Sequence, residues 1–178
     1  MRNTILTSCS LLLVLAATGP AGARAATPPP AGGANQRVSV EGCQNQWLFD
    51  GVWRVRVSNV SPTGSDATLE VRNGTKDTLS APDGGFAKVN GQGIDMAFDD
   101  GSVQGLDLGA TQESYRSELS YKKLPPGGGA KTTLHFAPPP NPSAKPLKLL
   151  IAVDPHYNSY VHYPTKDPSF RVRVDCTK

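Results

Sequence analysis

Hydrophobic and polar residues alternate along most of the chain beyond residue 36, with the period of two that is typical of a half-buried β-strand. In residues 53–58, for example, a tryptophan and two valines alternate with two arginines and a serine. The runs that share this pattern lie at residues 38–40, 53–58, 68–72, 94–99, 115–122, 133–136, 147–153 and 170–176. Pro, Gly, Asn and Asp separate the runs and leave little uninterrupted length for a helix. The pattern predicts an all-β fold, and we expect an antiparallel β-sandwich of about eight strands rather than a barrel.

The sequence before this patterned region predicts export. Residues 1–25 have the three parts of a secretory signal peptide: Arg2, an apolar run at 11–17, and the small residues Ala23 and Ala25 before the cleavage point. Neither this run nor any later one approaches the roughly 20 apolar residues that a membrane-spanning helix needs. We therefore expect a protein that is secreted, or that stays in the periplasm or cell envelope.

The rest of the chain divides into a linker and a single domain. Residues 26–36 are rich in Pro, Gly and Ala and contain no aromatic or branched apolar residue, so they are expected to form a flexible tether. Residues 37–178 have the size of one domain, which we expect to be the β-sandwich.

Three cysteines bear on how this domain is closed. Cys9 lies in the signal peptide, whereas Cys43 and Cys176 bracket nearly the whole patterned region. An even pair in an exported chain predicts a disulfide, which would join the two ends of the domain and stabilise it by about 4–5 kcal/mol. Cys176 alternates in phase with Val172 and Val174, so we expect it to point inward. The alternative is two free thiols, with Cys176 as a nucleophile or Cys43 pairing between molecules.

Two segments resemble a known family. Residues 47–57 read Trp-Leu-Phe-Asp-Gly-Val-Trp-Arg-Val-Arg-Val, and residues 69–75 read Leu-Glu-Val-Arg-Asn-Gly-Thr. With the runs at 115–121, 131–136 and 147–153, they resemble the telokin-like bacterial exported domains, which are grouped with the immunoprotective extracellular proteins. The resemblance covers most of residues 37–176 and implies an immunoglobulin-like sandwich outside the cytoplasm. It implies no established activity and no catalytic residues.

Charge and motifs exclude several classes of function. The formal net charge of +3 falls to +1 when residues 1–25 are removed, which argues against general nucleic-acid or anionic-membrane binding. The chain contains no Gly-x-Ser-x-Gly, no His-Glu-x-x-His and no glycine-rich phosphate loop. We therefore expect a non-enzymatic protein without a cofactor. A glycosidase stays open, because the sequence does not place pairs of carboxylates in space.

The segment 154–163 is the first candidate for a binding site. It lies between two predicted strands, hence in a loop, and it carries two of the three histidines and three of the five tyrosines. As a recognition loop it would contact a partner through Tyr157, Tyr160, His162 and Tyr163. As a copper or zinc site it would use Asp154, His156 and His162, although their spacing is not that of a metal motif, so we expect no metal. The remaining interpretation is an ordinary long loop whose tyrosines pack over one end of the sandwich.

Four arginines are the second candidate. By alternation, all of them point away from the core: Arg54, Arg56, Arg171 and Arg173. If the disulfide brings their strands together, they form a basic patch for an acidic polymer or for the acidic face of a partner. Otherwise they are solvated and pair across strands with Glu70, Glu118 or Asp175.

A third cluster of charged residues favours a turn over a metal site. Asp95, Asp99, Asp100 and Asp107 do not have the spacing of a calcium-binding loop, and acids beside Gly101 are typical of a turn.

The sequence thus indicates an exported, monomeric, non-enzymatic domain that binds a protein or a cell-surface component through its loops. The alternatives are an accessory metal-binding protein and a structural envelope protein with no discrete ligand.

Overall fold

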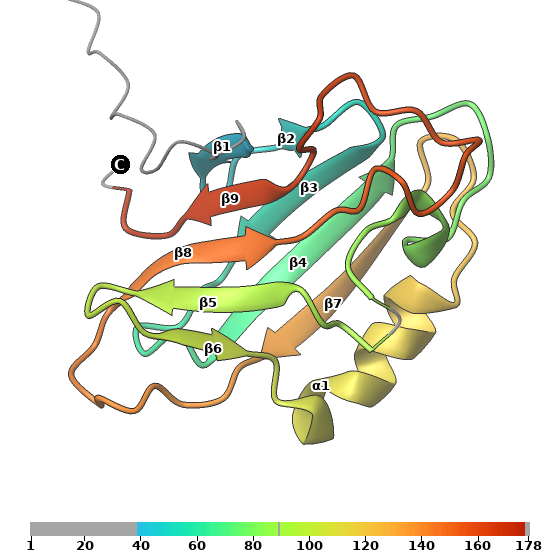
Figure 1. Cartoon of the computed structure of the whole chain (residues 1–178). Helices are drawn as coiled ribbons and strands as arrows, with labels where there is room; N and C mark the ends of the chain where they lie inside the picture. The colour runs from blue at the N-terminus through green and yellow to red at the C-terminus, as the bar shows by residue number, and fades with distance from the viewer. Residues whose placement is uncertain (1–38, 89, 177–178) are drawn as a thin grey trace, which may run out of the picture. The chain divides into compact units, whose positions relative to one another are not determined.

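Nine strands make two sheets in the part of the chain that the computed structural model describes, residues 39–88 and 90–176 (Figure 1). The strands are β1 (Val40–Cys43), β2 (Leu48–Phe49), β3 (Trp53–Ser58), β4 (Asp66–Asn73), β5 (Ile94–Phe98), β6 (Val103–Gly105), β7 (Gly129–His135), β8 (Pro146–Ile151) and β9 (Phe170–Arg173). The helical elements are the short 3₁₀ turn η1 (Pro82–Gly84), the helix α1 (Leu108–Tyr115) and the π-helical turn η2 (Arg116–Ser120) that continues it. The predicted signal peptide 1–25 and tether 26–36 lie outside the described residues.

The sheets have the orders β1-β9-β8-β5-β6 and β2-β3-β4-β7. β1 runs parallel to β9, and the other strand pairs are antiparallel. The predicted sandwich is confirmed, but nine strands are present where about eight were expected. The difference comes from β2 and β6, which are too short to give a clear alternation, and from the run at 115–122, which is not a strand.

The core lies between the two sheets. The inward residues of β3, namely Trp53, Val55 and Val57, are fully buried, as the alternation predicted. The rings of Trp53 and Phe86 meet edge to face with their centroids 6.0 Å apart, and Phe86 in turn lies 6.4 Å from Phe170 of β9. These aromatic contacts link the two sheets through the segment that follows β4.

The run at 115–122 was predicted to be a strand and is instead helical. Asp107 caps α1, since its Oδ1 accepts hydrogen bonds from the backbone N–H groups of Gly109 (3.0 Å) and Ala110 (3.4 Å). Tyr115 and Leu119 are buried, and residues four apart share one face of a helix as well as one face of a strand. Their spacing therefore fitted both structures, and the cap decides between them.

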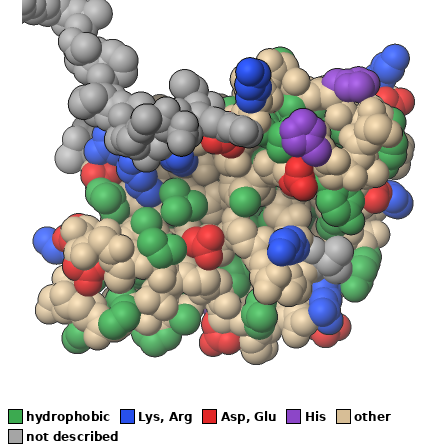
Figure 2. All heavy atoms as spheres, viewed as in Figure 1, with side chains coloured by type: hydrophobic (Ala, Val, Ile, Leu, Met, Phe, Trp, Pro, Cys, Tyr) green, Lys and Arg blue, Asp and Glu red, His purple; other side chains and the backbone are tan. Residues whose placement is uncertain are grey.

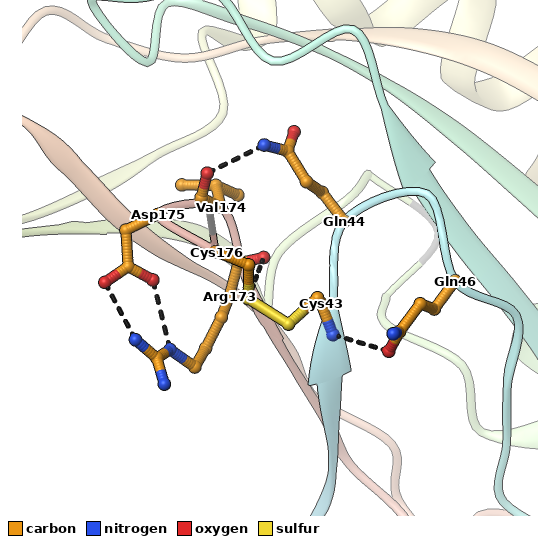
Figure 3. The surroundings of a disulfide bond; sticks show 7 residues. All are labelled: Cys43, Gln44, Gln46, Arg173, Val174, Asp175 and Cys176. Carbon is orange, nitrogen blue, oxygen red and sulfur yellow. Dashed lines mark hydrogen bonds and ion pairs between the residues drawn. A yellow bond between two sulfur atoms is a disulfide. The ribbon is translucent and has the colours of Figure 1, made fainter. Parts of the chain in front are cut away.

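The structure joins Cys43 and Cys176 in a disulfide, as predicted, with their Cα atoms 6.0 Å apart (Figure 3). Gln44 reinforces the connection, because its Nε2 donates to the carbonyl oxygen of Val174 (2.8 Å). The burial expected of Cys176 is only partial. Alternation continues past the end of β9, with Val174 buried and Asp175 exposed, but Cys176 is only partly buried and lies outside the core cluster.

Within the described part of the chain, no helix has the length and the apolar character that crossing a membrane requires.

Candidate functional site

The loop between β8 and β9 begins against the segment that follows η1 (Figure 1). Ala87 N donates to Ala152 O (2.9 Å), and Asp154 N donates to Gly85 O (2.8 Å). Gly85 has a φ of +72°, and a Cβ at this position would overlap the carbonyl oxygen of Asp154. Only glycine allows the loop to approach so closely, so the start of the loop is fixed in place.

Two side chains anchor the loop farther along. Asn158 Nδ2 donates to the carbonyl oxygen of Asp83 (2.5 Å), and the Tyr163 hydroxyl donates to that of Gly84, both in η1. η1 is itself held from two sides, because Trp53 Nε1 also donates to Gly84 O (3.3 Å) and Lys123 makes an ion pair with Asp83. Segment 154–163 is thus braced against a fixed turn rather than loosely attached.

The bracing leaves three of the four predicted contact residues of the loop exposed. Tyr157 and Tyr160 expose 57% and 61% of their surface, and His162 is exposed, as is His156. Tyr163 differs, because it is partly buried against the core and burial raises the pKa of its hydroxyl. Tyr163 is therefore an anchor of the loop and not part of the surface that the loop presents.

Two hollows are bordered by residues of this loop. The larger cleft, about 990 Å³, is bordered by Tyr157 and Asp154 on one side and by Lys88 and Arg116 on another. The smaller one, about 420 Å³, lies between His156 and His162 and includes Lys166. Figure 2 shows histidine, acidic and basic side chains gathered at this end of the molecule. The loop thus forms a ridge of tyrosine and histidine that borders both depressions.

A buried carboxyl lies beneath the ridge. Asp50 is only 2% exposed, and its Oδ1 accepts hydrogen bonds from the backbone N–H groups of Val52 (2.8 Å) and Trp53 (2.6 Å). Its Oδ2 has no hydrogen-bond partner among the described residues. Burial raises the pKa of Asp50 to about 7, and its charge in turn raises the pKa of Tyr163. Sequence reasoning missed Asp50, which reads as an ordinary turn residue before Gly51.

The proposed copper or zinc ligands do not form a metal site. Across residues 39–88 and 90–176, no three His, Cys, Asp or Glu side chains gather closely enough to hold one ion. The Oδ1 atom of Asp154 accepts a hydrogen bond from the backbone N–H of His156 (2.9 Å), so this carboxylate shapes the turn. The acids around Gly101 likewise form no metal site within these residues. Instead, Asp100 Oδ1 accepts hydrogen bonds from the backbone N–H and the hydroxyl of Ser102.

The four predicted arginines do not form one patch. Arg54 and Arg56 lie in β3 of the four-stranded sheet, whereas Arg171 and Arg173 lie in β9 of the five-stranded sheet. Both pairs alternate with core residues, so they point outward from opposite faces of the sandwich. The expectation failed because the disulfide joins the end of β1 to the residues that follow β9, and these strands are neighbours in a single sheet.

The outer face of the four-stranded sheet adds Trp47, Phe49 and Arg72, which sequence reasoning did not single out, to Arg54 and Arg56. The guanidinium carbon of Arg54 lies 4.8 Å from the ring centroid of Phe49, and those of Arg56 and Arg72 each lie 4.8 Å from the ring of Trp47. A signal was present in the sequence, because the two aromatic residues flank Leu48. Leu48 is buried, so alternation directs both aromatic rings outward.

Comparison with known proteins adds a likeness of fold. No family model matches the chain, and no curated protein matches it. A solved structure of an uncharacterized β-sandwich protein from Clostridium difficile is similar, with a TM-score of 0.44 and 9% identity over 78% of this chain and 95% of that one. Its likeness is one of fold alone, and the strands and sheets described above define this chain as a β-sandwich domain.

Proposed function

We propose that the chain is an exported, non-enzymatic, monomeric domain that binds a protein or a cell-surface component through segment 154–163. The observation that carries this proposal is the braced loop itself. Tyr163 and Asn158 fix it to η1, while Tyr157 and Tyr160 are left largely exposed. A loop that is ordered before binding loses less conformational entropy when it meets a partner. Tyrosine contributes a large contact area with few rotatable bonds, which is why it is common in recognition surfaces.

The strand order supports assigning the sandwich to the immunoglobulin-like class. With β3, β4, β5, β6, β7, β8 and β9 taken as A, B, C, C′, E, F and G, the sheets read A-B-E and G-F-C-C′, with β2 and β1 as additional edge strands. Variable-type immunoglobulin domains contain the same strand neighbours, together with a strand D that this arrangement lacks. It also agrees with the resemblance of the sequence to the telokin-like exported domains, so we extend the proposal to membership of that family.

Export rests on two independent features. One is the signal-like sequence of residues 1–25, and the other is the Cys43–Cys176 disulfide, since disulfides persist in oxidising compartments. We propose that the protein acts after secretion, in the medium or at the cell envelope.

Replacing the exposed residues of the loop tests the proposed function. The mature chain with Tyr157→Ala, Tyr160→Ala and His162→Ala should retain at least tenfold less partner from extracellular and cell-surface material than the wild type, as measured by affinity capture and mass spectrometry. Its melting temperature should stay within a few degrees, because none of the three side chains is buried.

Tyr121→Ala is the matched control, since Tyr121 is an equally exposed tyrosine (65%) outside the loop. It should capture as much as the wild type. Undiminished capture by the triple variant would exclude the loop as the binding surface.

A further inference from the structure

Two arginines face each other on the outer side of the four-stranded sheet. Arg54 of β3 and Arg72 of β4 are direct partners in the antiparallel register, and both are exposed. Side chains in such a pair start about 5 Å apart, and like charges placed there repel and destabilise the sheet. This arrangement therefore costs stability unless something else balances the charge.

No carboxylate within residues 39–88 and 90–176 forms an ion pair with either arginine. By contrast, Arg56 beside them bonds to Glu70 through Nη2 at 2.8 Å. Each of the two instead rests on an aromatic ring, Arg54 on Phe49 and Arg72 on Trp47. Such stacking orients a guanidinium group but leaves the N–H groups at its edge free to donate.

A hollow of about 310 Å³ lies at this pair, lined by Arg54, Arg72, Asn73, Gly74 and Gly127. The other donors around it are already used. The Nδ2 of Asn73 donates to two backbone carbonyls, Gly74 N donates to Val52 O, and Gly127 N donates to Asn73 O. The two guanidinium groups are therefore the donors that this hollow offers to a ligand.

We propose that Arg54 and Arg72 form an oxyanion site that binds the carboxylate or sulfate groups of an acidic polysaccharide. The planar fork of a guanidinium group matches a carboxylate or sulfate with two parallel hydrogen bonds. An anion between the two arginines would replace their repulsion with attraction to both.

A polymer fits better than a single small anion because a second hollow with a further cation adjoins the first. This hollow, of about 580 Å³, shares Arg72 and Gly127 with the first and is also lined by Lys131, by the ion pair of Lys122 with Glu118, and by Glu70, which is paired with Arg56. A chain with repeated negative groups can occupy both hollows at once. A protein partner would want an apolar centre in its interface, and the two exposed aromatic rings of this face are already stacked with arginines.

The site is separate from segment 154–163, so it stands or falls independently of the function proposed above. Isothermal titration calorimetry of the mature chain, at low and at moderate salt, tests the site. The ligands are alginate, which carries carboxylates, heparin, which carries sulfates, and, as comparisons, inorganic sulfate, neutral dextran and polyglutamate. Binding of alginate or heparin is expected, with affinity that falls as salt rises, competition by millimolar sulfate and no binding of dextran.

The variants isolate the two arginines from general charge. Arg54→Gln with Arg72→Gln should weaken polysaccharide binding at least tenfold. Arg171→Gln with Arg173→Gln removes the same charge from the opposite face and should leave the affinity within twofold.

An equal loss of polysaccharide affinity in both double variants would show that binding depends on net charge alone and would overturn the site. The absence of binding to either polysaccharide would overturn it as well. Binding of inorganic sulfate without either polymer would make it a small-anion site only. Polyglutamate that binds as tightly as the polysaccharides and depends on the same arginines would overturn the assignment to sugar polymers.

Discussion

The two outer faces of the sandwich carry the same short pattern, an arginine at every second position, but they differ in how many of these arginines meet a carboxylate. On the five-stranded sheet, Arg171 lies 3.5 Å from a carboxylate oxygen of Glu41, and Arg173 lies 3.0 Å from one of Asp175. On the four-stranded sheet, Arg54 lies over a ring and has no carboxylate partner among the described residues. Both arginines of β9 are thus paired with a carboxylate, whereas of the two arginines of β3 Arg56 is paired with Glu70 and Arg54 is not.

The strand at the edge of each sheet makes the difference. β1 places Glu41 directly beside Arg171, whereas β2 places Phe49 directly beside Arg54. Both edge strands come from one short stretch of chain, residues 40–49. For Arg171 and Arg54, the neighbouring edge strand therefore decides whether the arginine meets a carboxylate or an aromatic ring.

Loss of the Cys43–Cys176 disulfide, which ties the end of β1 to the residues after β9, should have the largest effect of the changes considered. The disulfide closes a loop with a sequence separation of 133 residues, so its loss should lower the free energy of unfolding by roughly 5 kcal/mol. Urea denaturation of the protein before and after reduction measures the change. The double variant Cys43→Ser, Cys176→Ser should match the reduced wild type, and the oxidised, denatured mature protein should show no titratable thiol. An unchanged midpoint after confirmed reduction would contradict the role of the disulfide in closing the domain.

A second prediction concerns the turn that sets Phe49 beside Arg54. Asp50 holds this turn through Val52 and Trp53, and its pKa is raised from 3.8 to about 7 in the folded protein. The folded state therefore binds more protons than the unfolded state between these values, so stability falls as pH rises through this window and is level above it. The free energy of unfolding should drop by roughly 2–3 kcal/mol between pH 5 and pH 8.

Asp50→Asn keeps the acceptor oxygen and removes the titration. Urea midpoints of this variant should change far less over the same pH range and should exceed those of the wild type at pH 8. Parallel pH curves for the two proteins would show that another group governs the dependence.

The smallest expected effects compare the arginine pairs directly. A double-mutant cycle on Arg54→Gln and Arg72→Gln should give an unfavourable coupling energy of about 0.5 kcal/mol, because the two charges repel. The same cycle on Arg56→Gln and Glu70→Gln should give a favourable coupling of similar size. Both should shrink as salt is added, and a favourable sign for the first pair would contradict its uncompensated charge.

Alternation predicted most strands because burial of every second residue is a local property of an extended chain. It predicted the wrong structure at Tyr115 and Leu119, whose separation of four fits a helix equally well. Asp107 and its cap were the missing signal, and the acid was assigned to a turn instead. The short strands β2 and β6 were missed because two or three residues cannot show a period.

The roles of the residues in the two proposed binding surfaces could not be predicted from the sequence, because they depend on contacts between distant parts of the chain. Tyr163 was expected to meet a partner, yet the carbonyl group that binds it belongs to Gly84, 79 residues earlier. The pairing of Arg54 with Arg72 follows from the register of β3 and β4, which are joined by a loop too long for the rules of tight hairpins to determine. The sequence placed Tyr157 and Tyr160 in a loop, where side chains are commonly exposed, but it left open whether they pack over the sandwich; the structure exposes both.

The disulfide between the start and the end of the domain also determines how the protein carries tension. A pull applied between a residue before Cys43 and one after Cys176 passes through β1 and then through the covalent bond. Residues 44–175 lie outside that path, so β1 alone bears the load and strands β2 to β9 are not stretched while the bond is intact. Both proposed binding surfaces lie within residues 44–175, so a pull on the two ends of the domain would not reach them along the backbone.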